Sequence, residues 1–227
     1  MAAYVEIGEP PIVVRVKRSA RAHRISLRIS GTGGGVSLTL PEHAGLVEAV
    51  AFARLKERWL RQHLDARPDA VQVDIGVEVP VEGRMIRIAS GGGRRYPVRT
   101  EDTLEVPLRG APGRVKAYLR TLARDRLTAA SDRYASALGK GFCKITLRDP
   151  RSRWGSCTSD GALMYSWRLV MAPPKVLAYV AAHEIAHLVE MNHSSAFWAV
   201  VEHLCPGHVV PRTWLKREGF ALHRYRF

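Results

Sequence analysis

Residues 173–193 read PPKVLAYVAAHEIAHLVEMNH, and this stretch decides the expected fold of the second half of the chain. The two prolines at its start suit the first turn of a helix, where a missing backbone N–H costs nothing. The polar residues inside the following apolar run are His183, Glu184 and His187, which form an H-E-x-x-H motif. Because residues i and i+4 lie above one another on a helix, both imidazoles can reach one ion. The stretch therefore predicts a metal-binding helix.

The chemistry of this motif favours zinc. Zinc takes neutral histidine nitrogen at about 2.0–2.1 Å, and a catalytic site keeps one position open for water. Glu184 follows the first histidine directly and is placed to accept a proton from that water as a general base. The motif predicts Zn²⁺ as cofactor, His183 and His187 as ligands, and Glu184 as the catalytic residue.

A third ligand is expected at His193, which gives the spacing H-E-x-x-H-x5-H found in metzincins. A continuous helix would carry residue 193 roughly 240° past His187 and about 9 Å further along the axis, so the helix must end first. We expect Asn192 to end it in a left-handed C-cap, and Ser194 or Ser195 to cap the next helix. Glu190 occupies the metzincin glycine position, so the match is not a strict metzincin.

Other residues compete for roles in this site. Glu202 is the alternative third ligand of a gluzincin-like site, with His203 and His208 close to it in sequence. Cys157 is a weak candidate nucleophile because a zinc site already supplies activated water. Trp154 either lines the cleft or packs into the core. Four side chains are candidates to stabilise an oxyanion: Arg153, Tyr165, His208 and Arg212.

The rest of the chain predicts an α+β protein. Apolar residues alternate with polar ones in residues 12–40 and 71–108, which indicates strands, and residues 42–64 are helical. Gly31 to Gly35 is expected to be a flexible hairpin connection, and no internal repeat is apparent. After residues 109–113 the pattern changes to a helix of roughly 25 residues ending near Gly139. Further elements are expected in order: strands at 142–149 and 162–172, the helix from 173, and helices near 195–204 and 211–218. We therefore expect a β-rich N-terminal region with one helix at 1–110 and a metal-binding α+β domain at 111–227.

Composition limits the function classes. The 227 residues are 46% hydrophobic and 25% charged, which is ordinary globular usage. Three cysteines make no disulfide framework, and neither a secretory signal nor a membrane-spanning run is present, so we expect a cytoplasmic protein and no membrane partner. The net charge is +14, of which residues 113–227 carry +10 (18 Lys/Arg, 8 Asp/Glu). This excess predicts weak nucleic-acid binding at low salt, unless the arginines only solvate the surface.

Several motifs together resemble the YgjP-like zinc metallopeptidases, which are related to SprT-like and Wss-type proteases. The resemblance is carried by these stretches: RSARAHRISLRIS (18–30), WLRQHL (59–64), RWGSC (153–157), MYSWRLV (164–170), APP (172–174) and HEIAHLVEMNHSSAFW (183–198). It implies a zincin-like domain with zinc on His183, His187 and His193, and a catalytic Glu184. The sequence departs from the family pattern at Ser166 and at Gly207-His208, and neither departure touches a ligand position.

The expected function is zinc-dependent hydrolysis of peptide bonds in a polypeptide substrate. The strand from Leu163 to Val170 is expected to be an edge strand that pairs with an extended substrate. Two alternatives stay open: a nucleic-acid-associated protease of the SprT or Wss type, and a non-catalytic, zinc-stabilised binding module. The presence of Glu184 argues against the binding module, because a purely structural zinc site needs no such carboxyl group. The sequence leaves the oligomeric state undetermined.

Overall fold

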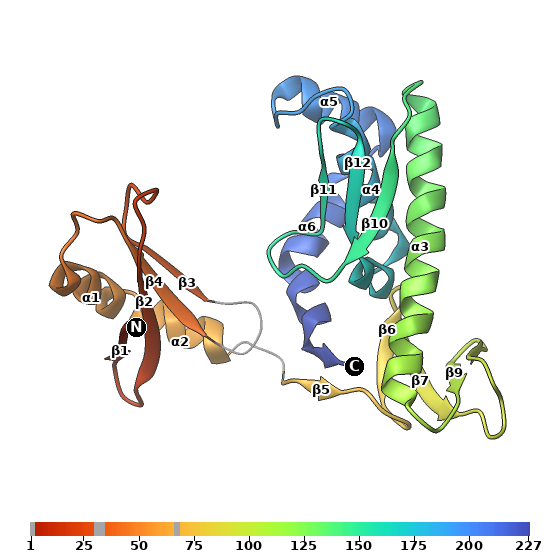
Figure 1. The fold of residues 1–227 in the computed structure, drawn as a ribbon, viewed down its shortest axis with the longest axis horizontal. Coiled ribbons are helices and arrows are strands. Elements are labelled where there is room, and N and C mark those ends of the chain that lie inside the picture. Colours follow the sequence, from red (N-terminus) through yellow and green to blue (C-terminus); the bar gives the residue numbers. More distant parts are fainter. Residues whose placement is uncertain (1–2, 30–34, 66–68) are drawn as a thin grey trace. The chain divides into compact units, whose positions relative to one another are not determined.

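The computed structural model describes residues 3–29, 35–65 and 69–227. The described chain is mixed α+β, as predicted, and divides into two compact units, Met1–Asp69 and Ala70–Phe227 (Figure 1). The glycine-rich connection expected from residue 31 lies, up to residue 34, outside the described residues. Among the residues that the structure describes, no helix has the length and apolar character needed to cross a membrane.

The N-terminal unit is a four-stranded sheet in the order β1-β2-β4-β3, with two helices packed on one face. Its elements are β1 (Ala3–Ile7), β2 (Ile12–Arg18), β3 (Ser26–Ile29), β4 (Val36–Leu40), α1 (Leu46–Leu55) and α2 (Glu57–Asp65). Alternate strand residues such as Val14 and Leu38 point toward the helices and meet Ala53 and Leu60 in a buried core. The single helix expected at 42–64 is thus two helices, which meet at Lys56.

The C-terminal unit contains a second four-stranded sheet, a long helix, a three-stranded sheet and the helices that follow (Figure 1). Its first elements are β5 (Val71–Gln72), β6 (Glu78–Val81), β7 (Arg84–Ser90), β8 (Val98–Arg99), β9 (Thr103–Val106), α3 (Ala111–Ala137), β10 (Lys144–Arg148), β11 (Gly155–Cys157) and β12 (Ala162–Ser166). The chain ends with the 3₁₀ helix η1 (Trp167–Met171), α4 (Pro174–Ala186), α5 (Ser195–Leu204), α6 (Val209–Glu218), the 3₁₀ helix η2 (Gly219–Arg224) and β13 (Tyr225–Arg226).

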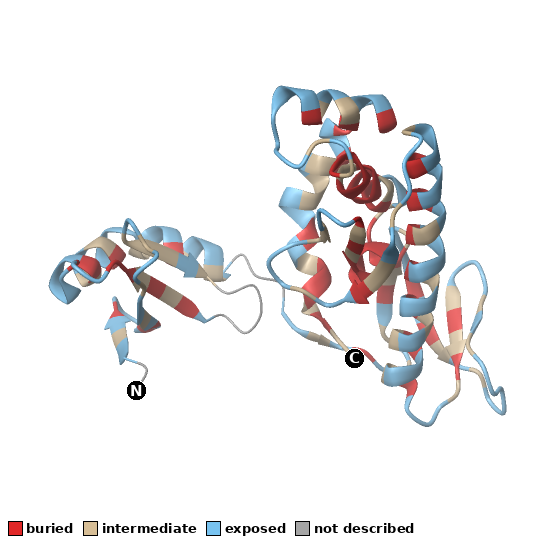
Figure 2. Cartoon of the chain, turned by 45° about the horizontal axis from the view of Figure 1, so that its top comes forward, coloured by how far each residue is buried: buried red, intermediate tan, exposed pale blue. Residues whose placement is uncertain are grey.

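The boundary between the units lies at Asp69/Ala70, whereas the sequence pattern placed it at 110/111. The strands β6–β9 belong to the C-terminal unit because they share its core. Ile86, Ile88 and Leu104 of the sheet lie in one buried cluster with Val115 and Leu119 of α3. The change of periodicity at 109–113 therefore marks the start of a helix inside one unit. Figure 2 shows this buried stripe along α3, and most residues of α4 are buried as well.

The two four-stranded sheets have the same topology, although the sequence shows no internal repeat. In each, the first two strands form an antiparallel hairpin, the second and fourth are parallel, and the third and fourth are antiparallel. A helix follows the fourth strand in both cases. The structure therefore contains two ββββα modules, β1 to α1 and β6 to α3, which sequence periodicity did not reveal.

The three-stranded sheet has the order β10-β12-β11, so β12 is the central strand. The expectation that Leu163 to Val170 is an edge strand is wrong on two counts. The strand ends at Ser166 and continues as η1, and both of its edges are already paired. The edge on the α4 side is β11, for which the sequence pattern predicted no strand.

Candidate metal centre

The helix α4 brings the H-E-x-x-H motif into the core of the C-terminal unit. It starts at Pro174, as expected, and ends at Ala186, after which the chain turns through residues 187–189. The expected left-handed cap at Asn192 is not found. Within the described ranges, Glu82 is the only non-glycine residue with a positive φ. The turn directly after Ala186 makes a later cap unnecessary, because it already bends the chain back before His193.

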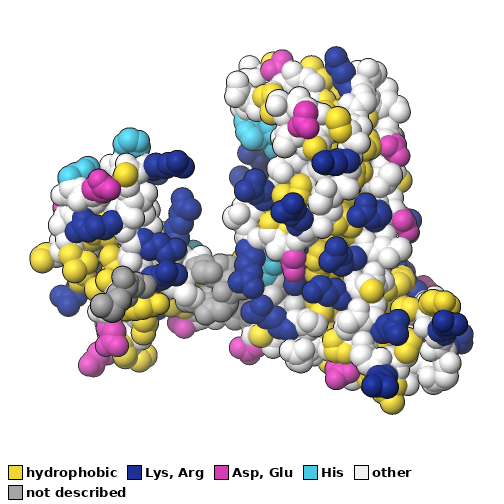
Figure 3. All heavy atoms as spheres, viewed as in Figure 1, with side chains coloured by type: hydrophobic (Ala, Val, Ile, Leu, Met, Phe, Trp, Pro, Cys, Tyr) yellow, Lys and Arg dark blue, Asp and Glu magenta, His cyan; other side chains and the backbone are white. Residues whose placement is uncertain are grey.

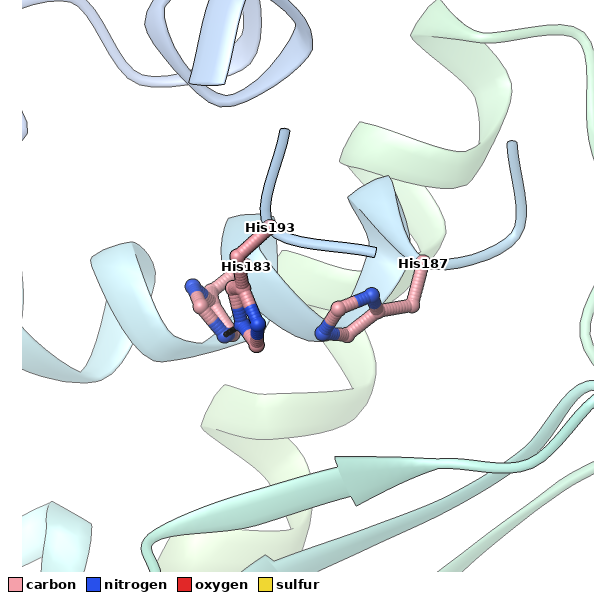
Figure 4. Close-up of side chains that lie close together, drawn as sticks. All are labelled: His183, His187 and His193. Atoms are coloured by element: carbon pink, nitrogen blue, oxygen red, sulfur yellow. Dashed lines mark hydrogen bonds between the residues drawn. The ribbon is translucent and has the colours of Figure 1, made fainter. Parts of the chain in front are cut away.

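The side chains of His183, His187 and His193 converge on one point (Figure 4). One ring nitrogen from each lies within 4.8 Å of the other two. The Nε2 atoms of His183 and His193 are 3.0 Å apart. Nitrogen ligands at about 2.0–2.1 Å from a tetrahedral zinc lie roughly 3.3 Å from one another, so this spacing fits a zinc ion.

Two of the three histidines, His183 and His187, are held in the neutral form that a metal requires. Burial lowers the pKa of His183 to about 3, and the neighbouring imidazoles lower it further in the same direction. Burial also lowers the pKa of His187. The Nδ1 of His187 donates to the carbonyl oxygen of Glu190 at 2.9 Å, which leaves Nε2 with its lone pair toward the cluster. The cluster therefore offers three imidazole nitrogens to a metal ion.

One aromatic ring supports all three imidazoles, and sequence reasoning missed it. Phe197, fully buried on α5, has its ring centroid 4.5–4.9 Å from the rings of His183, His187 and His193. The hydroxyl of Ser194 accepts from the N–H of Phe197 at 3.3 Å and caps α5, as predicted. Because the ring of Phe197 packs against all three imidazoles, it restricts their rotamers. The only sequence signal for it is the FW pair that follows His193.

Glu184 lies against a glycine that leaves space for its carboxyl group. The side chain is 5% exposed, and burial raises its pKa to about 8, partly offset by the charge of Arg153. A Cβ on Gly155 of β11 would come within 2.7 Å of the Glu184 Cγ and still closer to Oε1. The edge strand β11 thus passes directly beside the candidate base.

Glu202 is engaged elsewhere in the described structure and is not among the converging ligand atoms. Its carboxylate accepts from Nδ1 of His208 at 2.6 Å and from the N–H of Gly207 at 3.1 Å. The ring of His208 stacks between Tyr179 and Trp198, with centroids 6.2 Å and 5.5 Å away. Both of those aromatic rings also contact His183, so the His208–Glu202 pair adjoins the cluster.

The remaining candidates separate into core residues and site neighbours. Tyr165 is fully buried, its hydroxyl lies 3.0 Å from that of Ser131, and burial raises its pKa, so it is a core residue. Trp154 packs against His223 with ring centroids 5.3 Å apart, so of its two expected roles the structure supports packing into the core. Burial raises the pKa of the Cys157 thiol to about 11, which keeps it protonated and unreactive near neutral pH. Arg212 lies over the ring of Trp198 at 4.2 Å, beside the cluster.

The H-E-x-x-H motif of this α+β unit supplies two histidines and a glutamate, and His193 joins them from the segment after the helix. This arrangement is typical of metallopeptidases. A family model described as "YgjP-like, metallopeptidase domain" matches residues 23–218. The chain therefore belongs to the YgjP-like metallopeptidase family, and the match extends over both compact units.

The crystal structure of the metallopeptidase zymogen of Pyrococcus abyssi abylysin is similar to part of the chain. The similarity covers 42% of this chain and 95% of that one, at 24% identity and a TM-score of 0.35. No curated protein matches the sequence.

Proposed function

We propose that this protein is a zinc-dependent metallopeptidase in which His183, His187 and His193 hold the metal and Glu184 is the general base. The observation that carries the proposal is the convergence of three imidazoles beside the buried carboxyl group of Glu184. The family membership supports a metal-dependent peptidase, and the donor set favours zinc.

A zinc ion held here would polarise the scissile carbonyl and activate a water molecule at neutral pH. Glu184 accepts a proton from the attacking water and delivers it to the leaving amine. Its place against Gly155 and its low exposure keep competing solvent away from the carboxyl group. Three side chains remain candidates to stabilise negative charge on the substrate: Arg153, whose charge acts on Glu184, His208, which pairs with Glu202, and Arg212.

The polypeptide substrate pairs with β11 in this proposal. β11 is an edge strand whose other side pairs with β12, and its Gly155 adjoins Glu184. An extended peptide added to this edge gains backbone hydrogen bonds and places a peptide bond near the base. Recognition through the backbone gives loose side-chain specificity, so an unstructured protein is a suitable test substrate.

The decisive experiment compares Glu184→Gln with the parent protein after loading with zinc. The substitution keeps size and helix propensity but removes the base, so we expect zinc content and folding to stay unchanged. Cleavage of casein is expected to fall by about 10²–10⁴-fold. Glu218→Gln, the same change at an exposed helical position, is the matched control and should cleave like the parent.

Two outcomes would overturn parts of this proposal. Equal cleavage by Glu184→Gln and the parent would remove Glu184 from the mechanism. A parent protein that binds zinc stoichiometrically and cleaves nothing would indicate the non-catalytic binding module instead.

A further inference from the structure

The sheet of the N-terminal unit has one face covered by α1 and α2, and its opposite face carries an ordered set of polar residues. The strand register places Tyr4, Arg15, Ser37 and Arg28 in one row across β1, β2, β4 and β3. The next row contains Lys17 beside Thr39. We call the surface formed by these residues the cationic face: Tyr4, Arg15, Lys17, Arg28, Ser37 and Thr39.

The charges of the cationic face are not neutralised. Arg15, Lys17 and Arg28 are exposed, and among the described residues none of them forms an ion pair with a carboxylate. Residues 10–41 contain six Lys or Arg and no Asp or Glu. Among the described residues, the one carboxylate on this face is that of Glu6 on β1, which forms no ion pair with these cations. Arg18 differs from the other three, because it donates to the carbonyl oxygens of Glu42 and Ala44 and so holds the loop after β4.

The second ββββα module shows that this charge is not a consequence of the topology. Its equivalent face has a row of Glu78, Arg87 and Thr103, followed by a row that contains Glu105. There Arg94 pairs with Glu105 at 2.8 Å. Two sheets with the same strand order thus differ in the charge of their uncovered faces, and only the N-terminal one concentrates unpaired cations.

We propose that the cationic face binds single-stranded nucleic acid. Cations on β2 and β3, with hydroxyl groups of the intervening β4 between them, suit the phosphate backbone. Strands are about 4.8 Å apart, so Arg15 and Arg28 are separated by two such spacings. Tyr4 is 60% exposed at the end of the row, where a base can stack on its ring. An acidic peptide would use the cations but gain nothing from an exposed aromatic platform, so nucleic acid is favoured.

The cationic face assigns nucleic-acid binding to a particular surface of the N-terminal unit. The sequence expectation rested on the +10 charge of residues 113–227. In the view of Figure 3, Lys and Arg side chains lie over both units, so net charge alone does not locate a binding site. The inference goes beyond the proposed peptidase function and does not depend on it.

The test compares two triple variants of the full chain that remove the same number of charges. Arg15→Gln/Lys17→Gln/Arg28→Gln removes the cations of the face, and Arg54→Gln/Lys56→Gln/Arg58→Gln removes three exposed cations of α1, α2 and their junction. Binding of labelled poly(dT) and poly(U) is measured by fluorescence anisotropy over a salt series. Single strands lose about 0.7 in slope per phosphate contact, so three contacts predict a change in salt slope of about 2 for the first variant.

We expect the first triple variant to bind about tenfold or more weakly at low salt, and the second to remain within about threefold of the parent. Tyr4→Ala should weaken binding about fivefold or more without changing the salt slope, because stacking releases no counterions. Equal losses in both triple variants, an absence of binding at low salt, or preferential binding of polyglutamate would each overturn the proposal. Casein cleavage by the first variant should match that of the parent. A negative result in the nucleic-acid binding test is therefore distinct from a negative result for the proposed peptidase activity.

Discussion

Replacing Gly155 by alanine is expected to inactivate the enzyme while leaving its fold and its metal site intact. The added Cβ would lie 2.7 Å from Cγ and 2.8 Å from Cδ of Glu184, well inside van der Waals contact. The three atoms nearest to the added Cβ all belong to the Glu184 side chain, so we expect Glu184 to rotate away and the strand to stay in place. Overpacking of this kind costs about 1–3 kcal/mol of stability.

The effect on catalysis is expected to be larger than the effect on stability. Displacing a catalytic group by about 1 Å costs on the order of 10²-fold in rate. The three atoms nearest to the added Cβ all belong to Glu184, so we expect the histidines to stay in place and zinc content to be unchanged. The assay measures casein cleavage, zinc per chain and thermal unfolding on the same preparations.

Two controls define the result. Gly141→Ala adds the same methyl group where nothing lies within 4 Å, and it should leave cleavage unchanged. In a Glu184→Gln background, Gly155→Ala should cause no further loss, because the residue it acts through has already lost its base. Cleavage by Gly155→Ala within about threefold of the parent would refute the claim that this glycine makes room for the base.

Three further predictions concern the metal and the pH dependence of stability. His193→Ala should lose most of the bound zinc in elemental analysis while Glu202→Ala retains it, and the reverse pattern would assign the third ligand to Glu202. Phe197→Leu should weaken zinc affinity by about 10–100-fold in a chelator competition, because the Phe197 ring packs against all three imidazoles. An unchanged affinity would show that Phe197 does not orient the ligands. Burial, and then the charge of Arg168, lower the pKa of His223 from 6.5 to about 4, so its contribution is complete above pH 6.5 and is lost as pH falls toward 4. Chemical unfolding of the parent should therefore show roughly 3 kcal/mol more acid destabilisation near pH 4 than His223→Gln, and parallel pH profiles would contradict this.

The local features of the active helix could be predicted from the sequence because they depend on helical geometry. The i, i+4 spacing places His183 and His187 on one face of α4 whatever surrounds it. The distance to His193 required the helix to end early, and it does end early. The residue expected to end it was wrong, since the turn begins directly after Ala186 and needs no left-handed Asn192.

Periodicity also predicted most strands and helices, but it did not predict how they associate. The pattern change at 109–113 is real, yet the strands β6–β9 share one buried core with α3, so the boundary between units lies at 69/70. The strand order β10-β12-β11 made β12 central and β11 the edge, contrary to expectation. Strand order depends on contacts between segments far apart in sequence, and a period-2 pattern carries no information about them.

The amino-acid sequence by itself determined which residues we propose as metal ligands and as general base, because those proposals follow from residue type and short-range spacing. Only the tertiary structure decided what surrounds them. Phe197 beneath the imidazoles, Gly155 beside Glu184 and the cationic rows of the N-terminal sheet each join residues on separate elements. Residues of separate elements become neighbours when the elements pack their apolar faces together or pair as strands. That packing depends on the apolar area and shape of several elements at once, which no local stretch of sequence specifies.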